Sequence, residues 1–382
     1  MTNDIRRRAT RVSAATLVAA LALVGGITAC GKVDLKQQVD AAQTNLSHAK
    51  AASFTVRIAD PDNELASTAK TADDMNAARI FKAASLTFTV DPAGDRTLGD
   101  AGKAKPKSDD PVSALKASGA FEISYANAGK TVLALRSVGG VLYARLDPTQ
   151  WKTVAGKPLP LDDMNGPDAP PGTGPAVSGI RAGKWLSLDL AGLYTRAEEL
   201  GLTKANGANP AKLDPTRVQA LAKKIVEAVQ RNYTSTSTNK GDITTVQVKV
   251  KAKEALTAVL DTLGDPQFKD VLSAFGATGD AWLGQAKAAV ARIPAGAVTG
   301  SVTIRKDHFT QVAVDLGSIT ALATDPEAKK VRTARLLVDV DDSAAAVTAP
   351  AADQVVQVDA LADAVVGMAG AFAGAGAPRT AG

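Results

Sequence analysis

Alternation of apolar and polar residues with a period of two dominates the middle of the chain. The clearest region, 119–146, contains three such runs separated by residues 127–129 and 139–140, which suit tight hairpin turns. We therefore expect three consecutive antiparallel strands there. The same alternation predicts further strands at 53–58, 84–91, 183–190, 243–251, 297–306, 308–316 and 332–340.

Apolar residues at helical spacing alternate with these strands. Residues 33–52 place Leu35, Val39, Ala42, Leu46 and Ala49 on one face of a helix. Helices are also expected at 213–233, as three short pieces within 253–293, and as an amphipathic helix at 353–372. The polar stretch 234–242 is expected to be a turn.

Two segments and the C-terminal end predict little regular structure. Residues 92–114 and 155–183 are rich in Gly, Pro and Asp, so both are expected to be long loops, and 373–382 is expected to be a flexible tail.

An antiparallel sheet with one apolar face must bury that face against helices. Close packing would make the face part of the core, and looser packing would leave an apolar pocket; the sequence leaves both open.

The first thirty residues have the features of an export signal that ends in a cysteine. Four arginines precede the uncharged apolar stretch 13–27, which is too short to span a bilayer comfortably. Ile27, Thr28, Ala29 and Cys30 follow, and this order resembles the lipobox of bacterial lipoproteins. The resemblance implies that residues 1–29 are a lipoprotein signal peptide that is removed. Cys30 would then be the lipid attachment residue at the start of the new N-terminus, 30–32, carrying acyl chains such as palmitate on a diacylglyceryl group.

The charge balance and the cysteine count limit the partners and the covalent bonds expected of this chain. The chain has 44 Lys and Arg against 39 Asp and Glu, and removal of 1–29 takes away four Arg and one Asp, which leaves a net charge of +2. A nucleic-acid partner is therefore not expected, because the sequence has no basic stripe. With one cysteine, the chain cannot form an internal disulfide, so the fold must depend on core burial.

Residues for catalysis or metal binding are sparse. His48 and His308 are the only histidines, and no Gly-x-Ser-x-Gly sequence is present. Paired acids such as Asp162 and Asp163 fall mostly in expected loops. We expect no enzymatic activity, no cofactor and no metal site.

The order of elements resembles actinobacterial lipoproteins of the LolA/LppX-like class. The resemblance depends on "AKAASFTV", "VLALRSVGGVLYARLD", "GKWLSLDL" and "GSVTIRKDHFTQVAVDL", taken in that order after the cysteine. It implies an α+β fold over residues 33–345, with a curved antiparallel sheet, or half-open barrel, and helices packed over its concave face. Whether this region is one domain or two stays open.

The leading hypothesis is an extracytoplasmic lipoprotein, anchored to the cell membrane through Cys30, that binds or carries a hydrophobic, lipid-like ligand. The alternative is a cell-envelope interaction module without a ligand, which would present its two long loops to a protein partner. The residues expected to line a ligand site are the apolar positions of the strongest strands: Phe121, Ile123, Leu133, Leu135, Val246, Val248, Ile304, Val312 and Val314.

Overall fold

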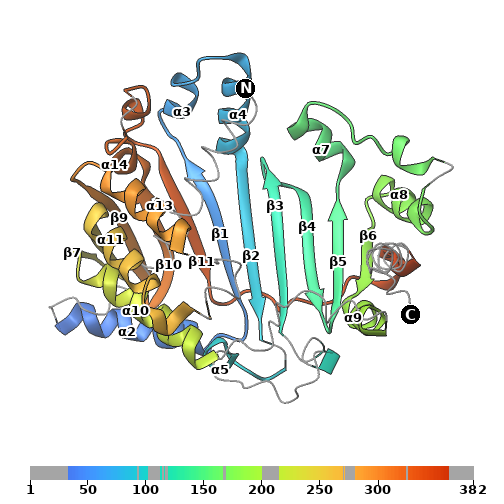
Figure 1. Ribbon diagram of the computed structural model, residues 1–382, viewed down its shortest axis with the longest axis horizontal. Helices are drawn as coiled ribbons and strands as arrows, with labels where there is room; N and C mark the ends of the chain where they lie inside the picture. Colours follow the sequence, from blue (N-terminus) through green and yellow to red (C-terminus); the bar gives the residue numbers. More distant parts are fainter. Residues whose placement is uncertain are drawn as a thin grey trace, which may run out of the picture. The chain divides into compact units, whose positions relative to one another are not determined.

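The computed structural model describes most of the chain after the signal region (Figure 1). The described residues are 33–92, 94–101, 112–113, 116, 119–166, 169–199, 215–269, 271, 280–323 and 326–360. The signal peptide 1–29, Cys30, most of 92–114 and the tail 373–382 lie outside them. The chain divides into two compact units, of which the first comprises the described parts of Met1–His48, Phe54–Lys82 and Lys212–Asp342, and the second those of Ala49–Ser53, Ala83–Ala211 and Ser343–Gly382.

The strands of the first unit follow the order β1, β11, β10, β9, β8, β7. They span Ala52–Ala59 (β1), Tyr233–Lys240 (β7), Ile243–Lys251 (β8), Ala297–Arg305 (β9), His308–Asp315 (β10) and Arg335–Asp341 (β11). The strands from β7 to β11 pair antiparallel with their neighbours. The fold class, α+β with antiparallel strands, is therefore confirmed.

Strand β7 corrects the expected turn at 234–242. Its eight residues pair with β8 from Tyr233 opposite Val250 to Lys240 opposite Ile243. The segment lacks apolar alternation because β7 is an edge strand rich in Ser and Thr, and Thr suits extended backbone. Polarity alone therefore did not distinguish a solvated strand from a turn.

A closed core forms where the first helix packs on this sheet. Helix α2 (Val33–His48) places Val39 and Ala42 against the apolar side chains on one side of β8, β9 and β10. At the edge of this contact, the Thr244 hydroxyl donates a hydrogen bond of 2.6 Å to Oε1 of Gln38. The strand residues of this cluster are Val246, Val248, Val302, Ile304, Phe309, Val312 and Val314.

The remaining helices of the first unit are mostly short. A second apolar cluster, centred on Leu221, Phe268 and Val271, joins residues of α10 and α11. In Figure 1, α10, α11 and α13 overlie the strands of this unit. The helices span Glu64–Ser67 (α3), Ala72–Ala83 (α4), Pro215–Gln230 (α10), Ala252–Leu263 (α11), Pro266–Phe268 (η5), Asp280–Ala291 (α13), Leu316–Thr320 (α14) and Ala328–Lys330 (η6).

The second unit contains the expected hairpins. Its strands follow the order β12, β6, β5, β4, β3, β2, and all pair antiparallel except β12 with β6. Gly129 and Gly140 adopt positive φ angles of 76° and 84° in the two hairpin turns, a conformation that favours glycine. The strands span Ala84–Asp91 (β2), Ala120–Asn127 (β3), Lys130–Val138 (β4), Val141–Leu146 (β5), Trp185–Asp189 (β6) and Val355–Gln357 (β12).

Two expectations about this unit need correction. The segment 155–183 is not one long loop, because it contains η2 (Asp163–Asn165) and α8 (Thr173–Arg181), which packs beside β6 and β12. The expected helix 353–372 does not begin at 353: residues 352–354 form η7, and 355–357 pair with β6 as a strand. An unpaired edge of β6 offers hydrogen bonds that a helix at 355–357 cannot use. The other helices of this unit are α5 (Leu98–Ala101), α7 (Pro148–Ala155) and α9 (Leu190–Glu199).

Candidate functional site

One face of the sheet in the second unit is almost entirely apolar. Residues that are directly opposite each other in an antiparallel pair share a face, so the registers of β2 to β6 define its members. At the hairpin-turn end, Ala84, Asn127 and Lys130 also share this face; elsewhere Tyr125 and Ser137 bring the only polar groups to it. We call this set the apolar face: Leu86, Phe88, Val90, Phe121, Ile123, Tyr125, Leu133, Leu135, Ser137, Leu142, Ala144, Leu146, Leu186 and Leu188.

The apolar face is only half-covered. Val90, Phe121 and Leu133 are 39%, 38% and 38% exposed, and they belong to the few large apolar side chains that are exposed among the described residues. Every other member except Ser137 is half-buried. The corresponding face in the first unit is closed by α2. Contiguous exposed apolar surface of this kind is typical of binding sites.

The opposite face of the same sheet combines buried Ala120, Ala134 and Trp185 with charged residues, and it is held by ionic and aromatic contacts. The Arg136 guanidinium forms an ion pair of 2.6 Å with Glu122 and lies 4.9 Å above the ring of Trp185. It also donates a hydrogen bond of 2.6 Å to the carbonyl oxygen of Thr348. The Asp91 carboxylate accepts a hydrogen bond of 3.0 Å from the Val347 amide, so the segment around 347–348 is tied to this face. A cavity of about 670 Å³ on this side has a mixed lining that includes Tyr143, Ser187 and Gln357.

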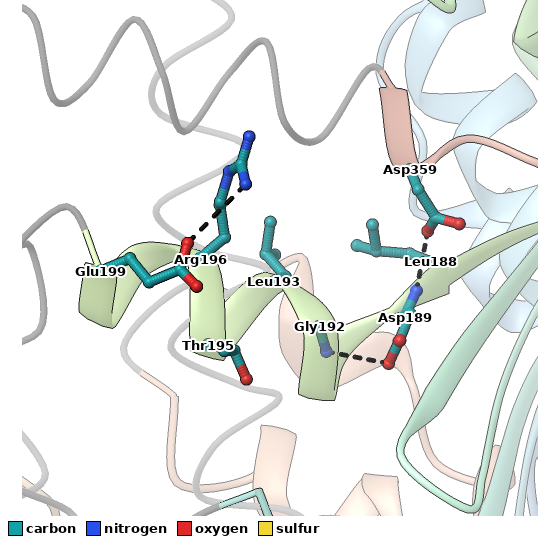
Figure 2. Close-up of a pocket in the computed structure, with 8 residues that line it drawn as sticks. All are labelled: Leu188, Asp189, Gly192, Leu193, Thr195, Arg196, Glu199 and Asp359. Atoms are coloured by element: carbon teal, nitrogen blue, oxygen red, sulfur yellow. Dashed lines mark hydrogen bonds and ion pairs between the residues drawn. The ribbon is translucent and has the colours of Figure 1, made fainter.

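A smaller cavity lies at the edge of the apolar face. It has a volume of about 380 Å³, and Leu188 of the apolar face forms part of its wall (Figure 2). The Asp189 carboxylate accepts hydrogen bonds of 3.0 Å from the Gly192 and Ala191 amides and thereby caps α9. Oδ1 of Asp359 accepts a bond of 3.1 Å from the Asp189 amide. The Asp189 and Asp359 carboxylates therefore both accept hydrogen bonds from backbone amides between residues 189 and 192.

The expected lining residues fall into two groups. Val246, Val248, Ile304, Val312 and Val314 are at most 4% exposed and pack under α2, so they are part of a closed core in the first unit. Phe121, Ile123, Leu133 and Leu135 lie together on the apolar face of the second unit. We keep only these four as candidate ligand contacts. Cys30 lies outside the described residues, so its lipidation stays a prediction.

Sequence reasoning did not select most of the apolar face. Phe88, Val90, Leu142, Leu186 and Leu188 were not among the expected lining residues. The alternation in 84–91 and 183–190 was visible, but only the strand order shows that these residues share a surface with Phe121 and Leu133.

The described residues offer little material for other chemistry. They contain no group of three or more His, Cys, Asp or Glu side chains placed to hold a metal ion. None of the helices described is long and apolar enough to cross a membrane. Of the acid pair at 162–163, Asp162 forms an ion pair with Arg181 and Asp163 begins η2.

In the first unit, hydrogen bonds from backbone amides lower the pKa of the Glu64 carboxylate. Oε2 of Glu64 accepts hydrogen bonds from the amides of Thr333, Arg332 and Ala334 at 2.7, 2.7 and 3.2 Å. The bond from the Thr333 backbone is the largest cause that lowers the pKa of Glu64, because it stabilises the charged form. Glu64 thereby fastens α3 to the segment that precedes β11.

Comparison with known proteins gives little further identification. No protein-family model matches the sequence, and no curated protein matches it. Among solved structures, the chain is similar to the crystal structure of the Mycobacterium tuberculosis lipoprotein LppX. The match covers 82% of this chain and 97% of that chain, with 9% identity and a TM-score of 0.28. A similarity this low supports no conclusion about ligand or activity.

Proposed function

We propose that this chain is an extracytoplasmic lipoprotein, anchored to the membrane through Cys30, that binds a hydrophobic, lipid-like molecule on the apolar face. The observation that supports this most strongly is the half-covered state of that face, on which Phe121 and Leu133 remain 38% exposed. A soluble sheet normally covers its apolar face with helices or a second sheet. An acyl chain would provide the missing cover.

The chemistry of the face favours an acyl chain over a polar ligand. Its members carry no charge, and their only hydroxyl groups are those of Tyr125 and Ser137. Burial of a methylene group contributes about 0.8 kcal/mol, so a chain of several methylenes gains affinity from this surface without specific hydrogen bonds. The ion pair of Arg136 with Glu122 lies on the opposite face, and Lys130, at the hairpin-turn end, is the one charged residue that the strand registers place on the apolar side.

The test is to purify the lipidated protein from membranes in mild detergent, extract it with organic solvent and identify the released lipids by mass spectrometry. The anchor stays covalently bound, so it does not contribute to the extract. We expect a stoichiometric lipid in the wild-type extract and its loss from a Phe121→Ser, Leu133→Ser double variant. A matched control, Met75→Ser with Phe81→Ser, changes two exposed apolar residues on α4 and should retain the lipid. A folded wild-type protein with no extractable lipid, which also binds no added long-chain fatty acid, would refute the proposal.

A further inference from the structure

The face of this sheet that lies opposite the apolar face carries a row of three polar side chains. Tyr143 of β5 is directly opposite Ser187 of β6, and Ser187 is directly opposite Gln357 of β12. Neighbouring strands lie about 4.8 Å apart, so the row is about 10 Å long. All three residues line the cavity of about 670 Å³. We call them the polar row.

The segment that leads into β12 forms another wall of this cavity, to which Pro350 belongs. The segment is fastened near both of its ends. The Thr348 carbonyl accepts a hydrogen bond of 2.6 Å from Arg136, and Lys184 donates one of 3.1 Å to the Asp353 carbonyl. Strand β12 then pairs with β6. Because hydrogen bonds hold this wall to the sheet, the cavity is a built feature of the fold.

The polar row has no hydrogen-bond partners inside the described part of the protein. Ser187 is only 6% exposed, and within the described residues its hydroxyl, like the Tyr143 and Gln357 side chains, forms no hydrogen bond. No fully buried side-chain oxygen or nitrogen of these residues lacks a partner. The Ser187 oxygen must therefore reach the open space of the cavity. A buried hydroxyl without a partner is unfavourable, and a ligand that supplies a partner removes that cost.

The charged groups around the cavity exclude an anionic ligand. Its described lining contains two carboxylates, those of Asp189 and Asp359, and no Lys, Arg or His side chain. Arg136, which is opposite Tyr143 on the same face, is already paired with Glu122. An anion in the cavity would therefore be repelled by two acids, with no free cation in the lining to offset them.

Hydroxyl groups match the polar groups of the cavity best. One oxygen of Asp189 accepts the amides at the start of α9, and one oxygen of Asp359 accepts the Asp189 amide (Figure 2). The other oxygen of each carboxylate can accept from a ligand. A hydroxyl can donate to a carboxylate, and it can both donate to and accept from the polar row. Val141 and Val355 add apolar surface for the C–H groups of a ligand.

We propose that this cavity binds a neutral sugar, with the polar row and the two carboxylates as its hydrogen-bonding groups. The cavity and the apolar face lie on opposite faces of one sheet, so this site goes beyond the proposed lipid binding and does not depend on it. A free saccharide and the head group of a glycolipid present the same hydroxyl groups to these residues.

Saturation-transfer NMR on the mature protein without its anchor tests the site. The probes are glucose, galactose and mannose as free sugars, and their octyl glycosides as lipid-borne forms. We expect transfer to the sugar protons, and a dissociation constant about tenfold higher in a Ser187→Ala, Gln357→Leu double variant, which lacks two hydrogen-bonding groups. The matched control, Ser178→Ala with Gln354→Leu, makes the same changes at exposed residues outside the lining and should keep wild-type affinity.

Each outcome separates the possible ligands. Binding of the free sugars supports a saccharide site, and binding of the octyl glycosides alone, weakened in the double variant, supports a glycolipid head group. Absence of transfer to all six probes, or equal affinities of the wild type and the double variant, would overturn the inference. Sugar binding without palmitate binding supports this site and refutes the proposed lipid function, and the reverse result refutes this site alone.

A second measurement uses Ser187→Ala without a ligand. Because the hydroxyl has no partner in the described protein, its removal should not lower the melting temperature. A clear fall in melting temperature would show that the Ser187 hydroxyl stabilises the fold, and it would contradict its assignment to a ligand.

Discussion

Replacement of Phe121 by serine is the most direct test of the apolar face. Phe121 is 38% exposed. A phenylalanine buries roughly 200 Å² when fully covered, so a ligand over Phe121 would remove about 75 Å² from water. At about 25 cal/mol per Å², this area contributes roughly 2 kcal/mol to binding. We therefore expect Phe121→Ser to weaken the binding of an acyl ligand about 25-fold.

The assay is a titration of a fluorescent long-chain fatty acid into the mature protein without its anchor. Phe81→Ser provides the matched control, because Phe81 is 50% exposed on α4 and lies outside the apolar face. This control should change the dissociation constant less than about twofold, and circular dichroism should show both variants folded. Wild-type affinity in Phe121→Ser, or an equal loss in Phe81→Ser, would show that the ligand does not contact the apolar face.

Three further predictions concern the core, the anchor and pH. Ile304→Ala should lower the free energy of unfolding by about 2–5 kcal/mol in a denaturant titration, because Ile304 is 2% exposed. Leu133→Ala should lower it clearly less, because Leu133 is 38% exposed. Similar losses in the two variants would contradict the closed core. Cys30→Ala should move the protein from the membrane fraction to the soluble fraction, and unchanged fractionation would refute the anchor. Glu64→Gln should lower the melting temperature at neutral pH, because the amides stabilise the charged form of Glu64. The difference in melting temperature between the two proteins should close as pH falls below the ordinary pKa of 4.5 and through the lowered pKa of the folded state. A difference that stays constant over this pH range for Glu64→Gln would refute this role.

Local patterns were enough to predict most of the elements. The strands at 84–91 and 243–251 agree with β2 and β8 at both ends, and the first helix agrees with α2 apart from its last residues. Period-two and period-3.6 patterns succeed here because each element buries one face. They fail at β7, where an edge strand has no apolar alternation, and at β12, where pairing with β6 decides the conformation. Helices α7, α8 and α9 were also not expected.

The sequence alone could not show which apolar strand faces are closed. Val312 in β10 and Leu133 in β4 follow the same alternation, yet α2 covers the first and no described helix buries the second. Coverage depends on which helix packs on which strand, and that is a long-range contact. The candidate site could therefore be predicted only as a list of apolar residues that mixed core positions with surface positions.

The sequence by itself determined the α+β class, most of the strands, the helices near 33–48 and 215–230, the scarcity of catalytic residues and the expectation of a lipid-bearing Cys30. These properties follow from residue type and short-range spacing. The tertiary structure decided that the strands divide between two units, that five of the expected lining residues form a closed core, and that β2 to β6 share one half-covered apolar face. The physical reason is that exposure of an apolar residue depends on strand order and packing partners, which join positions far apart in the chain.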